Sequence, residues 1–333
     1  MKDSLVLPAV FSSAIRKLIA PKSRSLLVEV KLRRFSYVEL VKMTNNFQRR
    51  IGKGGFGNIY HGELDGAPVA VKLYRNENPS VAAQFESEVN LLNKVYHKNL
   101  IKVFGYCDES TKSALVFEFM ANGDLRKNLT GSGCSSKLTW ERRLRIAIDM
   151  AKALDYLHDG CEPPIIHRNF NSSNILLSKN FEVRLSDFVL AVNFNPSHEG
   201  ESHMSNVTIT GTLGYMDPQY LTTGMLSTWA DVYGFGAVLM EIIAGRPAYQ
   251  YGEDGVLTQW VSSMFGNGEI GRIMDPKLEG DFDVNSVMEA LNIAFACLSC
   301  NSNDRPTMGE VVTKLKLCLQ METARLGTLI EDY

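Results

Sequence analysis

The stretch RRIGKGGFGNIYHGELDGAPVAVKLY, residues 49–74, contains a glycine cluster and an Asp-Gly pair. The runs on either side of Asp65-Gly66 are strand-like, and Asp-Gly is a strong signal for a two-residue hairpin turn. The clustered glycines within this predicted hairpin are Gly52, Gly54 and Gly57. A dinucleotide-binding fold places G-x-G-x-x-G between a strand and a helix, so this setting excludes that fold. In a hairpin, glycines let the backbone close over a polyphosphate because no Cβ is in the way.

The order of strand-like and helical segments predicts two lobes. From Phe35 to about Leu125 the pattern is strand-like, with one helix around residues 82–95. From Leu138 onward it is mostly helical, and residues 230–245 are apolar all round, as in a helix buried in a large core. The other helices expected there cover residues 139–158, Asn285–Cys300 and Thr307–Arg325. We therefore predict an α+β fold with a small sheet-rich lobe and a large helical lobe.

Composition limits the class of protein. The chain has 333 residues, of which 45% are hydrophobic and 22% are charged, as in ordinary soluble globular proteins. A net charge of −2 gives no general attraction to nucleic acid. The six cysteines are scattered, which fits a reducing compartment and predicts a cytoplasmic location. No apolar run reaches the ~18–20 residues that a membrane-spanning helix needs.

Residues 1–34 form a basic appendage. They carry eight Lys or Arg residues against Asp3 and Glu29, a net charge of +6, beside a short apolar helical face. We predict a loosely ordered basic tail. One alternative is a peripheral contact with an acidic membrane surface, such as the plasma membrane. A second alternative is an organelle transit peptide.

A second stretch, IIHRNFNSSNILL (Ile165–Leu177), is an apolar strand end, a polar loop and another apolar run. Together with NGDLRKNL, GTLGYMDPQY and DRPTM, it makes the chain after Phe35 resemble a protein kinase domain. The resemblance is strongest to plant leucine-rich-repeat receptor-like Ser/Thr kinases of the malectin-like type. It implies the two-lobed kinase fold, with a lobe of residues 35–120 that holds one key helix. A helical lobe of residues 121–325 and a tail of residues 326–333 would follow.

The resemblance implies a site for ATP and Mg²⁺, with Mn²⁺ as an alternative metal. The glycine loop would cover the phosphates, and a Lys72–Glu88 pair would fix the lysine against them. The hinge between the lobes would be VFEFM, residues 116–120. The remaining implied roles are Phe117 as gatekeeper, Glu118 and Met120 as backbone contacts to adenine, Asp187 and Asn174 as metal ligands, and Asp231 as a brace for the catalytic loop.

The catalytic loop departs from the kinase pattern H-R-D-x-K-x-x-N at two positions. His167, Arg168 and Asn174 are in place, but Asn169 replaces the Asp and Asn171 replaces the Lys. A neutral amide has almost no basicity, and loss of a positioned base typically removes ~10²–10⁴ in rate. The missing lysine charge is worth ~2.7–4 kcal/mol by analogy with other electrostatic groups.

Two further departures lie in the activation segment. Val189 replaces the Gly after Asp187-Phe188, and a β-branched residue should restrict rotation of that pair. Gln219 replaces the Glu of A-P-E, which in the family pairs with the Arg matching Arg305. Because an uncompensated buried Arg is costly, we expect local looseness or a substitute acid.

Three functional hypotheses follow. The first is a pseudokinase that binds Mg-ATP, transfers phosphate poorly or not at all, and serves as an interaction module for signalling proteins and receptor kinases. The second is an active Ser/Thr kinase with an unusual loop. The third is a binding protein whose nucleotide cleft is vestigial. Three threonines, Thr208, Thr210 and Thr212, lie where the activation segment carries hydroxyls, and Arg168 would receive a phosphate there.

Overall fold

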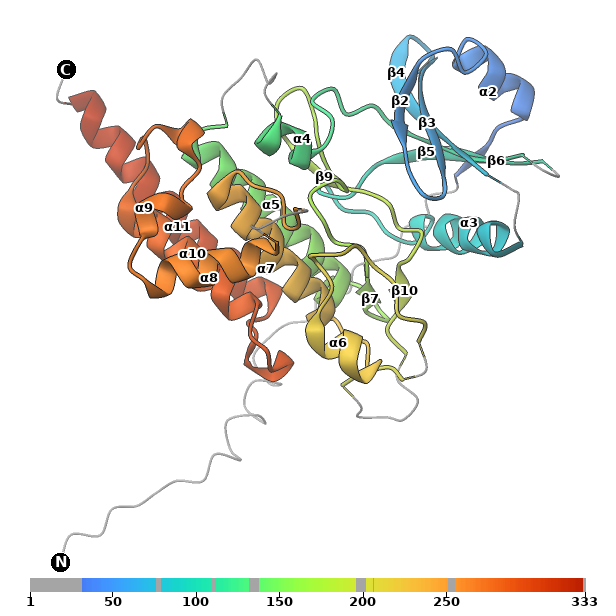
Figure 1. Ribbon diagram of the computed structural model, residues 1–333. Coiled ribbons are helices and arrows are strands. Elements are labelled where there is room, and N and C mark those ends of the chain that lie inside the picture. Colours follow the sequence, from blue (N-terminus) through green and yellow to red (C-terminus); the bar gives the residue numbers. More distant parts are fainter. Residues whose placement is uncertain are drawn as a thin grey trace, which may run out of the picture.

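The computed structural model describes residues 32–75, 79–109, 112–131, 138–195, 202–205, 207–250 and 255–331. A lobe built on a sheet joins a larger helical lobe, which confirms the predicted two-lobed α+β fold (Figure 1). The basic appendage expected at residues 1–34 lies outside the described residues, except for its last three. Within the described ranges, no helix combines the length and apolar character needed to cross a membrane.

The smaller lobe contains a six-stranded sheet. Its strands are β1 (Arg33–Arg34), β2 (Arg50–Lys53), β3 (Gly57–Leu64), β4 (Ala67–Tyr74), β5 (Val103–Glu109) and β6 (Lys112–Glu118). They lie in the order β1-β5-β6-β4-β3-β2, and all pairs are antiparallel except β1 with β5. The turn between β3 and β4 has φ values of 51° at Asp65 and 79° at Gly66, as a type I′ hairpin requires. The predicted hairpin is therefore confirmed, and the sheet begins two residues before the expected boundary at residue 35.

Successive side chains along β4 point to opposite faces of the sheet, and each face packs against a different part of the core. Val69 and Val71 pack with Phe35 and Leu40 on one face of the sheet. On the other face, Tyr74 packs with the core that continues into the helical lobe. Because successive strand residues point to opposite faces, Lys72 shares the face of Tyr74. This alternation places the lysine between the two lobes.

Two helices flank the sheet, where the sequence predicted one. The predicted helix is α3 (Pro79–Leu92), and the additional one is α2 (Tyr37–Met43). Ser36 and Glu39 form a capping box at the start of α2, since each side chain accepts from the other's backbone N–H. The Ser-x-x-Glu spacing was the signal in the sequence for this helix, and its omission was an error.

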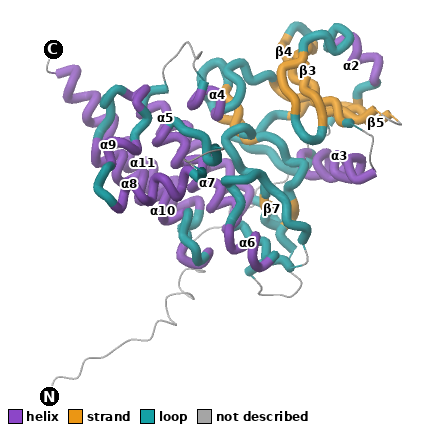
Figure 2. Tube along the Cα trace, viewed as in Figure 1, coloured by secondary structure: helices purple, strands orange, loops and turns teal. Residues whose placement is uncertain are grey.

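The larger lobe is helical, as predicted (Figure 2). Its described α-helices are α4 (Leu125–Thr130), α5 (Trp140–Asp155), α6 (Pro218–Thr223), α7 (Trp229–Ala244), α8 (Leu257–Gly266), α9 (Ile270–Ile273), α10 (Val284–Cys297) and α11 (Met308–Glu331). The expected buried helix is α7, and it packs against α10, while α11 packs against α5. Trp140 is fully buried at the start of α5 and donates to Ser286 Oγ of α10 at 2.9 Å. The helices α4, α6, α8 and α9 were not predicted.

Four short strands of the larger lobe flank the loops that face the smaller lobe. They are β7 (Ile165–Ile166), β8 (Ile175–Leu177), β9 (Val183–Leu185) and β10 (Val192–Asn193). The strands β7 and β8 flank the asparagine-rich loop, and β9 ends two residues before Asp187. Leu185 donates to the carbonyl of Asn99 at 2.8 Å and accepts from the N–H of Ile101 at 2.9 Å. These bonds tie β9 to the smaller lobe, so the loop and Asp187 face the sheet.

Candidate nucleotide and phosphotransfer site

Lys72 of β4 lies between two carboxylates. Its Nζ is 3.3 Å from Glu88 Oε2 on α3 and 2.7 Å from Asp187 Oδ1. Burial alone would lower the pKa of Lys72, but the two carboxylates outweigh burial and raise this pKa. Burial also opposes ionisation of Asp187, but Lys72 outweighs it and lowers the pKa of Asp187. The structure therefore brings together three of the predicted site residues, and the pKa shifts of Lys72 and Asp187 favour their charged forms.

Glu88 holds α3 against this site. Its Oε1 accepts from the backbone N–H of Phe188 at 3.2 Å, and its Oε2 accepts from the Tyr74 hydroxyl as well as from Lys72. Burial raises the pKa of Glu88, because the charged carboxylate is disfavoured away from water. The negative charge of Glu88 therefore depends on these three donors. Tyr74 was not among the predicted site residues.

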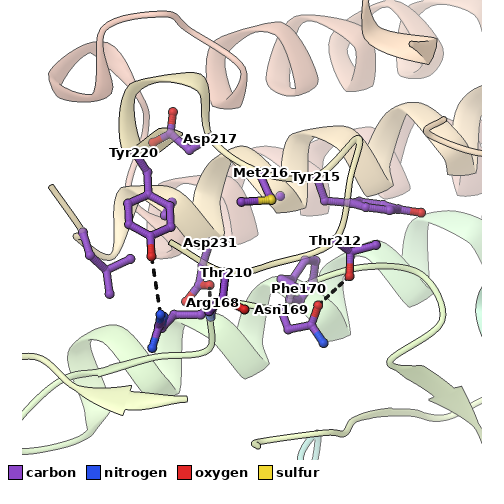
Figure 3. Close-up of a pocket in the computed structure, with 13 residues that line it drawn as sticks. Arg168, Asn169, Phe170, Thr210, Thr212, Tyr215, Met216, Asp217, Tyr220 and Asp231 are labelled. Carbon is purple, nitrogen blue, oxygen red and sulfur yellow. Dashed lines mark hydrogen bonds between the residues drawn. The ribbon is translucent and has the colours of Figure 1, made fainter. Parts of the chain in front are cut away.

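The Asn169 side-chain amide makes three hydrogen bonds within the protein. Its Nδ2 donates to Asp187 Oδ2 at 3.2 Å. Its Oδ1 accepts from Thr212 Oγ1 at 2.7 Å and from Asn171 Nδ2 at 3.1 Å (Figure 3). A carbonyl oxygen has two lone pairs, so these two donors use its accepting capacity. The group at the position of the kinase base is thus neutral and already occupied.

Asn171 is buried and serves the loop itself. Its Nδ2 also donates to the Asn169 carbonyl at 2.9 Å, and its Oδ1 accepts from the N–H of Ser173 at 2.9 Å. Asn174 Nδ2 donates to the same Asn169 carbonyl at 2.9 Å. The Asn174 amide oxygen then remains as the atom that would contact a cation. Carboxylate and amide oxygens are ligands that Mg²⁺ accepts, so the donor set of Asp187 and Asn174 fits this metal.

Asp231 of α7 holds the backbone of the catalytic loop by hydrogen bonds, as the kinase resemblance implied. It accepts from the N–H of His167 at 2.7 Å and from the N–H of Arg168 at 2.9 Å. It also lies 3.0 Å from His158 Nε2. His167 contacts Ser186 O through Nε2 at 3.1 Å, and burial lowers the pKa of His167. His167 therefore acts as a neutral structural side chain of the loop.

The glycine loop has the shape that the sequence predicted. Gly57 pairs with Tyr74, and a Cβ there would lie 2.2 Å from the Leu73 carbonyl oxygen. Gly54 donates to the Gly57 carbonyl at 2.9 Å, which closes the tip of the loop. A Cβ at Gly52 would contact Ile59 at 3.3 Å, whereas one at Gly54 would meet only a carbonyl oxygen at 3.9 Å. A Cβ at the tip of the loop would therefore meet little, and the role of the loop toward a polyphosphate stays a prediction.

The predicted hinge, residues 116–120, covers the end of β6 and the two residues after it. Phe117 and Met120 are buried in the core that spans both lobes. The N–H of Glu118 donates to the Lys102 carbonyl at 2.9 Å, so this group is used within the fold. The Glu118 carboxylate also accepts from the Lys102 N–H at 2.8 Å and from Arg184 Nε at 3.0 Å. The roles of Glu118 and Met120 toward adenine stay predictions.

The backbone reverses at Asp187, the predicted metal ligand. Its φ is 67°, in the left-handed region, whereas Val189 is buried and has an ordinary negative φ. Phe188 is also buried and contacts the His167 ring edge to face at 5.0 Å. Val189 therefore fits this arrangement without strain, and its expected effect on rotation stays a prediction.

The predicted substitute acid for Arg305 is Asp217. The guanidinium forms a two-pronged pair, with Nη1 2.7 Å from Asp217 Oδ2 and Nη2 2.8 Å from Oδ1. Both residues are buried. Gln219 instead accepts from the Ser302 N–H at 3.0 Å. The acid thus lies two residues earlier in the chain than the resemblance placed it.

Arg168 contacts the activation segment. Its Nη2 donates to the Thr208 carbonyl at 2.7 Å. The same nitrogen lies 3.4 Å from the Tyr220 hydroxyl (Figure 3). Among the described residues, none bonds to its buried Nε. Thr210 and Thr212 both line a pocket with Arg168, and Thr212 also bonds to Asn169. Of the three predicted hydroxyl residues, Thr212 is therefore the one in the asparagine network, which the sequence did not indicate.

Glu241 of α7 provides a pH-dependent prediction. Burial raises its pKa to about 7, although Tyr215 donates to Oε1 at 2.9 Å and Arg126 of α4 opposes the shift. The folded chain therefore binds this proton more tightly than the unfolded chain, so stability falls as pH rises from about 4.5 to about 7. The contribution of Glu241 should approach roughly 3 kcal/mol in the wild type, and Glu241→Gln should lack this contribution. Denaturant unfolding of both proteins between pH 4.5 and 8 measures it, and parallel curves would contradict it.

Comparison with known proteins agrees with this geometry. The family described as protein tyrosine and serine/threonine kinase matches residues 45–315. A probable LRR receptor-like serine/threonine-protein kinase of Arabidopsis thaliana is 46% identical over 296 residues, which are 89% of this chain and 34% of that relative. A second protein with this description from the same plant is 44% identical over 330 residues, or 99% of this chain and 36% of the relative. The chain spans about a third of the length of these curated relatives. The chain belongs to the protein tyrosine and serine/threonine kinase family.

Proposed function

We propose that this chain binds Mg-ATP between its lobes and transfers the γ-phosphate poorly or not at all. Its cellular role would be that of a pseudokinase in plant receptor-kinase signalling. The observation that supports this most directly is the Asn169 amide, which bonds to Asp187, Thr212 and Asn171. Residue 169 itself carries no carboxylate, and its amide oxygen has no spare lone pair for a substrate hydroxyl.

The nucleotide-binding part of the proposal rests on the charged residues. Lys72 would contact phosphate oxygens, and Glu88 fixes the lysine from α3. Asp187 and Asn174 would hold Mg²⁺, which would neutralise charge on the phosphates. The chain's own contribution is to orient the nucleotide and to close the glycine loop over it. The same set weighs against a vestigial cleft, since a cleft without a ligand has no use for a buried lysine between two carboxylates.

Nucleotide binding is tested by a thermal shift. At Mg-ATP concentrations 100-fold above Kd, the wild type should gain ~2.7 kcal/mol, or a rise in melting temperature of roughly 5–10 °C. Lys72→Ala should lose most of this shift, because the phosphates then lack their cation. Lys102→Ala, a change at a lysine on the smaller lobe that contacts Phe104, serves as the control. Absence of a shift in the wild type at millimolar Mg-ATP would contradict nucleotide binding.

An active Ser/Thr kinase is the second candidate. The curated relatives are named as serine/threonine kinases, and phosphoryl transfer depends mostly on positioning and metal electrostatics. Transfer of labelled phosphate, measured on the same preparation beside an Asp187→Ala control, separates the two candidates. Transfer that Asp187→Ala abolishes would favour the active kinase.

Location and partners are further parts of the proposal. We place the domain in the cytoplasm, where ATP is available, with signalling proteins and receptor kinases as partners. The net charge of +6 in residues 1–34 supports contact with an anionic membrane surface, at ~1 kcal/mol per basic residue near the surface.

A further inference from the structure

Tyr74 lies on β4, two residues after Lys72 and on the same face of the strand. The side chain is buried, and its hydroxyl donates to Glu88 Oε2, the oxygen that also accepts from Lys72. Its ring meets the Phe85 ring of α3 edge to face, with the centroids 5.1 Å apart. The Lys72 ammonium lies 5.0 Å from the centroid of the Tyr74 ring. One tyrosine thus contacts both members of the Lys72–Glu88 pair and the helix that carries the glutamate.

The backbone of Tyr74 adds a third connection. In the register of β3 and β4, Tyr74 is the partner of Gly57, the last glycine of the glycine loop. A Cβ at Gly57 would lie only 3.1 Å from Tyr74 Cα, so the two strands approach closely at this point. Tyr74 therefore connects the loop over the phosphates, the strand with the lysine and the helix with the glutamate.

The distances around Lys72 show why α3 needs this contact. The lysine ammonium is nearer to Asp187 Oδ1, at 2.7 Å, than to Glu88 Oε2, at 3.3 Å. Without Tyr74, the buried Glu88 carboxylate would keep only the Phe188 N–H and this longer contact. A buried carboxylate that lacks donors is costly, so α3 would move toward solvent.

The tyrosine hydroxyl is suited to this role. Burial raises the pKa of Tyr74 well above its usual range, and the neighbouring Glu88 carboxylate adds to the effect. The hydroxyl therefore keeps its proton and acts as a donor to Glu88 throughout the physiological range. Unlike Lys72, it has no competing carboxylate or phosphate partner within the described structure.

We propose that Tyr74 is a positioning residue that holds α3 and Glu88 in place before nucleotide binds, independently of the lysine. The proposal rests on the proposed nucleotide-binding function. It adds to that function a residue that was not among the predicted site residues, because the Tyr74 hydroxyl would keep α3 in the position that nucleotide binding needs. The free chain would accordingly keep the geometry of the nucleotide site, and binding would require little movement of the helix.

Tyr74→Phe is the sharpest variant, because it keeps the ring contacts with Phe85 and Lys72 and removes the hydroxyl alone. A hydrogen bond to a buried charged group is worth roughly ten- to a hundred-fold in an equilibrium. Amide hydrogen exchange of residues 79–92 in the nucleotide-free chain should therefore become about tenfold or more faster. Mg-ATP affinity should fall by a similar or smaller factor, since binding then includes the return of α3.

Tyr215→Phe is the matched control. Tyr215 also donates from a buried hydroxyl to a buried glutamate, Glu241 of the helical lobe, at 2.9 Å. It should leave exchange in residues 79–92 unchanged. A Tyr74→Phe variant with wild-type exchange in α3, or with exchange that rises equally throughout the chain, would overturn the proposal. Because exchange is measured without nucleotide, failure of the wild type to bind Mg-ATP would contradict the nucleotide-binding function and leave this measurement decisive for Tyr74.

Discussion

Asn169→Asp combined with Asn171→Lys should raise the rate of phosphate transfer by at least ~10²-fold over the wild type. The first change supplies a proton acceptor in place of the amide that now donates to Asp187 and accepts from Thr212. The second supplies a cation beside the transferring phosphoryl group. A base alone is worth ~10²–10⁴, but groups that act on one transition state do not add independently. Asn169→Asp alone should therefore give a smaller gain than the pair.

The site also predicts side effects of these changes. A carboxylate at position 169 would lie beside Asp187, where the wild type has an amide donor 3.2 Å from Asp187 Oδ2. Like charges at this distance repel, so the single variant should depend more strongly on Mg²⁺ for both stability and nucleotide binding. Asn171→Lys loses the bond to the Ser173 N–H, which the buried amide now makes at 2.9 Å. A modest fall in stability should accompany the gain in rate.

Autophosphorylation and transfer to a generic protein substrate measure the gain. The control carries Lys72→Ala together with both loop changes, and it should be inactive if transfer uses the proposed nucleotide site. Val189→Gly as a third change tests the segment after Asp187. If this triple variant binds ATP as the wild type does and transfers phosphate no faster, the defect does not lie in the loop.

Asp217→Asn should lower the free energy of unfolding by ~3–5 kcal/mol, the range for breaking one partner of a buried ion pair. At ~2–4 °C per kcal/mol, the melting temperature should fall by roughly 6–20 °C. Asp217 also caps α6 by accepting from the Gln219 N–H at 2.9 Å. Asparagine can keep this cap, so the loss measures mainly the charge opposite Arg305.

Gln219→Ala is the matched control for this pair. It removes only the bond to the Ser302 N–H and should cost ~0.5–1.5 kcal/mol. The double change Asp217→Ala with Gln219→Glu tests whether an acid at the position implied by the kinase resemblance can serve Arg305. Recovery of stability would show that both positions reach the guanidinium. An Asp217→Asn melting temperature equal to that of the wild type would contradict the assigned ion pair.

The sequence was most informative where residues repeat a local pattern. The hairpin at Asp65-Gly66 and the buried helix at residues 230–245 follow from turn chemistry and apolar periodicity, which are local properties. Helix α2 has only seven residues and one fully buried apolar side chain, Leu40, so periodicity gave little signal. Its capping box was the better indicator.

The site was harder to predict in full, because its contacts join distant residues. Lys72 and Asp187 are 115 positions apart, and the bond between Thr212 and Asn169 spans 43. No spacing rule along the chain gives such distances. Tyr74 looked like an ordinary strand residue, since only the packed helix α3 shows which group its hydroxyl meets. Asp217 was not predicted as the partner of Arg305 for the same reason, although the cost of burying an unpaired arginine indicated that an acid was needed.

The backbone bonds of Leu185 join the two lobes. Its amide and carbonyl bond to Asn99 and Ile101 of the smaller lobe, while its strand partner Ile175 belongs to the larger one. A rigid-body rotation of one lobe that keeps these bonds would pivot close to Leu185. Asp187 lies two residues from this pivot and would be displaced little, whereas the glycine loop lies farther out and would sweep a wider arc. Opening to release the proposed nucleotide would thus lift the loop while the Asp187 carboxylate stays nearly in place.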